Sequence, residues 1–340
     1  MLLAAAALSA SPASAFSKAI WGPTQRNGVD QFPMYHRLGV SIYEADLNWA
    51  SVATSQPAQP TNPDDPAYHW PHDLAYAVRQ TRRFHMRVLL QVIATPRWAN
   101  GGKAWNWAPD RPADYARFVA AAAAHYPGVH LWMIWGEPTR TPNFEPLTPA
   151  RPNAPLTAAQ QQAPHIYSEM LDDAYGTLKR ISRSNLVIGG CTYTTGDIST
   201  QQWIENLRLP SGRVPRMDMY AHNPFSLQPP AFTSRPSPDG VVQFSDLRRL
   251  AAWIARYLHK PLPIFLSEWT IPTGIDQQFN FYVDPTVAAS WIRQALSLAR
   301  GWSRIYALGW INVYDSPPTS YGGLLTSTGV PKPSFYAFGG

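Results

Sequence analysis

Two glutamates stand where apolar, strand-like segments end. Glu137 closes the segment LWMIWGEP of residues 131–138, and Glu268 lies in IFLSEW of residues 264–269. Bulky apolar neighbours desolvate a carboxylate and raise its pKa, as a general acid working near neutral pH requires. A lone glutamate at a strand end is more often a salt-bridge partner, but two in similar surroundings favour a catalytic pair.

Eight short apolar runs supply the elements that would position this pair. Between most of them the apolar residues recur three and four positions apart, which predicts helices over 74–81, 115–126, 166–181, 247–258 and 292–299. Asp284-Pro285 and the segment Ser199 to Gln202 have the residue types of helix starts. The expected strands are Ile20–Trp21, Val40–Asp46, Arg87–Ala94, Leu131–Gly136, Leu186–Thr192, Met217–His222, Ile264–Trp269 and Tyr306–Val313.

This alternation of strands and helices predicts a parallel sheet covered by helices, and eight such strands close most naturally into a single (β/α)8 TIM barrel. An open doubly wound sheet is the alternative, but no Gly-rich phosphate loop follows the first strand. Long Pro-rich segments follow the strands, so we expect them as βα loops at the face where barrel enzymes build their sites. They cover residues 54–71, 96–112, 138–164, 223–244 and 271–286.

Taken together, the strand-end motifs make the chain resemble the clan A glycoside hydrolases, most of all the family 39 branch and its relatives. The fourth strand ends in Trp-x-Glu-Pro, the seventh in Glu-Trp, the sixth carries a His followed by an aromatic residue, and the eighth carries a Trp. The resemblance extends from Trp21 to the closing segment KPSFYAF of residues 332–338. Each motif alone is weak, and only their combination is specific.

The resemblance implies a retaining glycoside hydrolase with Glu137 as acid/base and Glu268 as nucleophile, their carboxyl groups about 5–5.5 Å apart. It also implies that Trp310 stacks on the sugar and that His222 hydrogen-bonds the sugar or the carboxylates. The alternatives are a Trp that only lines the barrel and a histidine satisfied inside it. Transglycosylation would use the same two carboxylates.

Three positions depart from the pattern of the clan. Gly136 replaces the Asn that binds the substrate 2-hydroxyl, Phe225 replaces a Tyr that supports the nucleophile, and Glu44 replaces an Arg. They put the usual substrate in doubt more than the mechanism, because both carboxylates remain. Glu44 and Asp46 alternate on one strand face and would either bind an unusual sugar or form ion pairs with an arginine such as Arg97. A catalytically weak carbohydrate-binding barrel is the rival interpretation.

Further candidates for sugar contact are aromatic. Trp135 lies beside Glu137, and Trp98, together with Trp105 and Trp107, follows the third strand. His69 and His72 sit in a Pro-rich loop without a third ligand, so we expect no metal. We expect no cofactor either, and no Gly-x-Ser-x-Gly elbow supports a serine hydrolase.

Composition and the N-terminal residues narrow the biological setting. The net charge is +6, but the basic residues are scattered and accompany no recognition motif, so we expect no nucleic-acid partner. Residues 1–15 run from an apolar stretch to Ala13-Ser14-Ala15, which predicts a cleaved signal peptide, a secreted domain over 16–340 and no membrane span. Cys191 is the only cysteine, so no internal disulfide can form. We expect a monomer acting on a carbohydrate.

Overall fold

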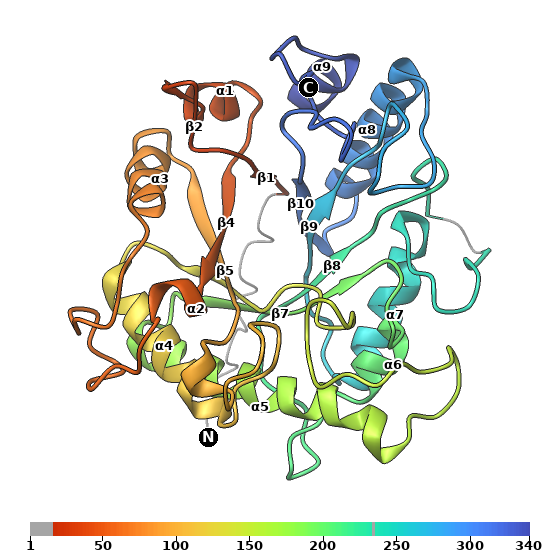
Figure 1. The fold of residues 1–340 in the computed structure, drawn as a ribbon. Helices are drawn as coiled ribbons and strands as arrows, with labels where there is room; N and C mark the ends of the chain where they lie inside the picture. The colour runs from red at the N-terminus through yellow and green to blue at the C-terminus, as the bar shows by residue number, and fades with distance from the viewer. Residues whose placement is uncertain (1–15, 233–234) are drawn as a thin grey trace, which may run out of the picture.

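A computed structural model describes residues 16–232 and 235–340; the predicted signal peptide, residues 1–15, lies outside them. Eight parallel strands close into a barrel in the order β1-β10-β9-β8-β7-β6-β5-β4, which confirms the predicted (β/α)8 fold (Figure 1). A two-stranded ribbon, β2 (Gln25–Arg26) and β3 (Val29–Asp30), follows the first strand. The barrel strands are β1 (Ser17–Trp21), β4 (Ile42–Asn48), β5 (Arg87–Ile93), β6 (Leu131–Ile134), β7 (Leu186–Tyr193), β8 (Met219–Asn223), β9 (Ile264–Trp269) and β10 (Ile305–Trp310).

Helices surround the barrel and include all five that the apolar spacing predicts. Both expected start signals operate: the side chain of Ser199 accepts a hydrogen bond from the backbone N–H of Gln202, and that of Asp284 accepts one from Thr286. The helices are α1 (Phe32–Arg37), α2 (Trp49–Val52), α3 (His72–Arg83), η1 (Arg97–Ala99), α4 (Pro112–His125), α5 (Ala158–Ile181), α6 (Thr200–Glu205), η2 (Phe244–Asp246), α7 (Leu247–Tyr257), α8 (Pro285–Arg300) and α9 (Pro333–Gly339).

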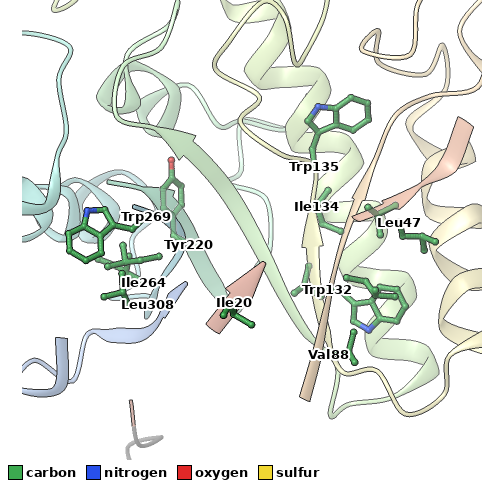
Figure 2. Close-up of a cluster of buried hydrophobic side chains, with 14 of the residues drawn as sticks. Ile20, Leu47, Val88, Trp132, Ile134, Trp135, Tyr220, Ile264, Trp269 and Leu308 are labelled. Carbon is green, nitrogen blue, oxygen red and sulfur yellow. The ribbon is translucent and has the colours of Figure 1, made fainter. Parts of the chain in front are cut away.

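Alternation along the strands divides the buried side chains into two clusters. Residues such as Leu89, Met133 and Phe265 belong to a small apolar cluster that plugs the barrel interior. Their neighbours belong to the larger cluster shared with the helices, in which Figure 2 shows Trp132, Tyr220 and others. Burying each large apolar side chain contributes about 1.5–3 kcal/mol to stability. The packed interior is therefore a rigid support for the residues at the end of the barrel.

Two strands contain an extra residue near their C-terminal ends. In β9, Leu266 and Trp269 pair with Leu308 and Trp310, three residues against two. In β7, Gly189 and Thr192 pair with Tyr220 and His222 of β8, again three residues against two. Such bulges change the direction in which side chains point and occur often beside active sites.

Long connections follow β4, β5, β6, β8 and β9, where the Pro-rich segments were expected. Because the strands are parallel, these loops meet at one end of the barrel, together with the C-terminal ends of the strands. None of the helices in the described ranges is long and apolar enough to cross a membrane.

Candidate active site

Glu137 follows β6 at the C-terminal end of the barrel, where it is 8% exposed. Its Oε2 accepts hydrogen bonds from Arg140 Nη1 at 2.7 Å and Asn143 Nδ2 at 3.1 Å, and its Oε1 accepts one from Asn223 Nδ2 at 2.9 Å. The backbone φ of Glu137 is 45°, in the left-handed region that non-glycine residues rarely adopt. Backbone strain of this kind persists where surrounding contacts hold it and is common at functional sites. Three donors therefore fix one carboxylate in an unusual conformation.

Glu268 lies in the bulged part of β9. Its backbone N–H donates to Asn223 Oδ1 at 3.1 Å, and no hydrogen bond to its carboxylate comes from the described residues. Burial raises the pKa of Glu268 well above its usual range, and the negative charge of Glu137 raises it further. The charges of Glu44 and Asp46 also raise the pKa of Glu268, while that of Arg140 lowers it. The two predicted catalytic residues thus interact at the barrel mouth.

Asn223 joins the two glutamates, and no sequence motif singled it out. Its amide N–H reaches the Glu137 carboxylate while its carbonyl accepts from the Glu268 backbone, so one side chain spans both. Asn223 alternates with Ala221, which belongs to the interior plug, so its side chain points inside the barrel. The only available signal was its position one residue after the selected histidine.

His222 points the opposite way and does not reach the glutamates. It is fully buried, with Nδ1 2.8 Å from Thr192 Oγ1 and Nε2 2.9 Å from the carbonyl of Val242. Both ring nitrogens are occupied, and burial lowers the pKa of His222 to about 4. The structure therefore corrects the expectation of a sugar contact: His222 is a neutral histidine satisfied within the fold.

Trp310 and Trp135 are also turned away from the barrel mouth. Trp310 is 0% exposed, donates from Nε1 to the carbonyl of Asn312 at 2.7 Å and packs edge-on against Trp269. Trp135 is 1% exposed and donates to the carbonyl of Asn143 at 2.8 Å. A ring without exposed surface cannot stack on a sugar, so neither assignment stands in this structure.

Among the remaining tryptophans, Trp98 packs into the protein and two neighbours stay partly open. Trp98 is half-buried, donates to the carbonyl of Ala53 at 2.8 Å and meets Trp49 edge-on. Trp105 is 48% exposed, and Trp107 carries Lys103 over its ring. These contacts hold the loop after β5, and whether any of the three rings touches a sugar stays a prediction.

Glu44 and Asp46 lie on the same inward face of β4. Glu44 is buried, its Oε2 accepts from Ser267 Oγ at 2.6 Å, and its Oε1 has no hydrogen-bond partner among the described residues. Asp46 retains exposed surface and accepts a 2.9 Å hydrogen bond from Gln91 Nε2. Burial raises the pKa of both carboxyl groups. No ion pair joins either to Arg97 or another arginine in the described ranges, so the ion-pair alternative was wrong.

The absence of a side chain at Gly136 has a steric explanation. A Cβ there would lie 2.8 Å from Gln91 Nε2 and 3.0 Å from Gln91 Cδ, closer than real contacts. The amide of Gln91 therefore fills the space that a larger residue 136 would need, and it places a polar group beside Glu137. Gln91 is a second site residue that the sequence did not reveal.

The charges around the barrel mouth do not balance. The charges of Glu137, Glu44 and Asp46 all raise the pKa of Glu268, and among the described residues Arg140 is a cation that lowers it. Arg140 lies 2.7 Å from Glu137 and also over the ring of Tyr193, 4.4 Å from its centroid. Negative charge therefore exceeds positive charge around Glu268, which favours the protonated form of its carboxyl group.

Solved structures share this architecture. No family model and no curated protein matches the sequence. A family 39 glycoside hydrolase from the gut symbiont Bacteroides cellulosilyticus WH2 has a TM-score of 0.64 at 16% identity, over 96% of this chain and 63% of that chain. The chain has the fold of the family 39 glycoside hydrolases.

Two further solved structures have a similar fold. A glucosidase from Croceicoccus marinus has a TM-score of 0.65 at 16% identity, over 96% of this chain and 65% of that one. A monomeric β-xylosidase from Caulobacter crescentus CB15 has a TM-score of 0.64 at 18% identity, over 95% of this chain and 67% of that one. The chain spans about two thirds of the length of these structures, and identities this low establish the fold alone.

Proposed function

We propose that this protein is a retaining glycoside hydrolase whose catalytic groups are Glu137 and Glu268. The observation that carries the proposal is the pair of glutamates joined through Asn223 at the C-terminal end of the barrel. Barrel enzymes place their catalytic residues at this end, and glycosidases need two carboxyl groups flanking one bond. The fold shared with family 39 enzymes supports the proposal.

In the first step, Glu137 donates its proton to the glycosidic oxygen while the Glu268 carboxylate forms a bond to the anomeric carbon. The leaving group departs as an alcohol. In the second step, Glu137 takes a proton from water, whose oxygen attacks the anomeric carbon and releases Glu268. Arg140, Asn143 and Asn223 are placed to stabilise the carboxylate that Glu137 becomes between the steps.

One observation favours a second candidate, in which the same reaction runs with the roles exchanged. Glu268 must be ionised to attack, yet burial and neighbouring carboxylates raise its pKa. Glu137, by contrast, accepts three hydrogen bonds that suit a negative charge. The resemblance to clan A assigns attack to Glu268, and we adopt that assignment.

Chemical rescue separates the two assignments. In Glu268→Ala the nucleophile is gone, so added azide should attack directly and give a glycosyl azide of inverted configuration. In Glu137→Ala the intermediate still forms from substrates with good leaving groups, so azide should give the retained configuration. Turnover without azide should fall roughly 10²–10⁴-fold in Glu137→Ala on poor leaving groups.

The reciprocal stereochemistry, retained from Glu268→Ala and inverted from Glu137→Ala, would establish the exchanged roles. Full activity of either variant on a panel of aryl glycosides and polysaccharides would refute a catalytic pair altogether. Circular dichroism of both variants controls for misfolding.

A further inference from the structure

A row of aromatic rings leads away from Glu137 and is not used in the steps above. It begins at Tyr193, over which Arg140 lies, and continues to Phe225 with 5.4 Å between ring centroids. Phe225 meets Phe279 at 5.3 Å, and Phe279 meets Phe281 at 6.0 Å. The rings come from the end of β7 and the loops after β8 and β9. We call these four residues the aromatic row.

The aromatic row lines a cavity of about 540 Å³. This volume is within the range of small-molecule sites. Leu227 also lines the cavity and is 64% exposed, which adds apolar surface that nothing in the described chain covers. A large exposed leucine beside contiguous aromatic rings is typical of a binding surface rather than of an ordinary loop.

Two polar groups of the cavity hold its loops, while the side chains of Gln277 and Asn280 also line it. The carboxylate of Asp276 accepts the backbone N–H groups of Gln278, Phe279 and Tyr321. Gln243 accepts from the backbone of Leu227 and donates to Ser237 Oγ. The loops are thereby fixed in advance, and the cavity offers mainly ring faces and aliphatic surface.

The position of the row relative to Glu137 decides which part of a substrate it meets. Arg140 contacts both Glu137, at 2.7 Å, and the ring of Tyr193. A general acid contacts the glycosidic oxygen, and the group beyond that oxygen is the one that leaves. An apolar wall that starts beside the acid is therefore in place to meet the leaving group.

We infer that the aromatic row is a leaving-group subsite and that it selects an aryl aglycone, a flat aromatic alcohol in glycosidic linkage. This inference rests on the proposed function, because it takes Glu137 as the acid. Flat rings pack on the row through offset and edge contacts, whereas its three phenylalanine rings offer no hydrogen-bond partner to the hydroxyl groups of a second sugar.

Matched glycosides of one sugar test the inference, because phenyl and 2-naphthyl leaving groups have similar acidity and differ mainly in aromatic area. Phe279→Ala should lower the ratio of kcat/KM for naphthyl over phenyl glycoside about tenfold. Leu227→Asp should act in the same direction, and because Leu227 is exposed it keeps the test valid if Phe279→Ala fails to fold. Tyr336→Ala, at a 68% exposed aromatic residue outside the row, is the matched control.

Titration with 2-naphthol by calorimetry separates this inference from the proposed function. If no glycoside is hydrolysed but naphthol binds the wild type and binds Leu227→Asp at least tenfold more weakly, the row still binds aryl groups, while the glycosidase proposal and the leaving-group role of the row both fail. If glycosides are hydrolysed while the naphthyl preference is unchanged in both variants, or disaccharides are preferred over aryl glycosides, the aryl subsite is refuted and the glycosidase proposal stands.

Discussion

For the substitution Gly136→Asn, the structure and the family pattern lead to opposite expectations about activity. The clan pattern places Asn at this position, so the sequence alone allows a gain in activity. The structure instead puts a Cβ of residue 136 only 2.8 Å from Gln91 Nε2, so Asn must displace the Gln91 amide. That amide donates a 2.9 Å hydrogen bond to Asp46 Oδ1. We therefore expect a loss rather than a gain.

The size of the loss follows from the hydrogen bond that is broken. A hydrogen bond to a charged acceptor contributes about 1.5–3 kcal/mol, which corresponds to roughly a 10- to 150-fold fall in kcat/KM if this pair positions the sugar. The melting temperature should change little, because the displaced atoms are the end of a flexible side chain. Gly212→Asn is the matched control, since a Cβ at residue 212 meets nothing within 4 Å.

A double-mutant cycle with Gln91→Ala completes the test. With the amide removed, Gly136→Asn should add little further loss, giving a coupling of about 1 kcal/mol or more. The assay is kcat/KM on one aryl glycoside, with thermal denaturation of all four proteins. Equal losses from Gly136→Asn in both backgrounds, or a gain in the wild-type background, would refute the steric explanation.

Two further predictions concern pH and stability. Burial lowers the pKa of His222 from 6.5 to about 4, so the stability that its neutral ring provides is complete above pH 6.5 and is lost as the pH falls toward 4. His222→Gln should flatten the dependence of melting temperature on pH in this window, and an unchanged slope would contradict it. Burial raises the pKa of Glu268, so its ionisation destabilises the fold as the pH rises. Glu268→Gln should melt higher than the wild type at pH 7, by a margin that shrinks as the pH falls toward 4.5, and a lower melting temperature at pH 7 would count against the repulsion between the carboxylates.

The sequence predicted the barrel because its signals are repetitive and local. Apolar runs marked all eight strands, and the caps at Ser199 and Asp284 marked helix starts, since each depends on only a few neighbouring residues. The strand-end glutamates were likewise found, because a carboxylate in an apolar run is conspicuous. Their catalytic roles stay a prediction that rescue chemistry must test.

The contacts of the site could not be predicted, because they depend on which face of a strand each residue occupies. A shift of one residue exchanges the two faces. The sequence selected His222 and Trp310, both of which point to the helices, while Asn223 points inside. Glu268 lies at a bulge, which no local pattern announced. The role of Gln91 could be recognised only from the structure, in which its side chain fills the space next to Gly136.

Asn223 makes the spacing of the catalytic pair adjustable by evolution or by design. An amide side chain has a fixed length, and this one contacts the carboxylate of Glu137 at one end and the backbone of Glu268 at the other. The separation of two such carboxyl groups determines whether a glycosidase retains or inverts configuration, by whether a water molecule fits between them. In the proposed enzyme, Asn223 is a non-catalytic residue that ties the Glu137 carboxylate to the Glu268 backbone and so bears on that separation. A shorter residue at 223 would be the place to begin in converting one reaction course into the other.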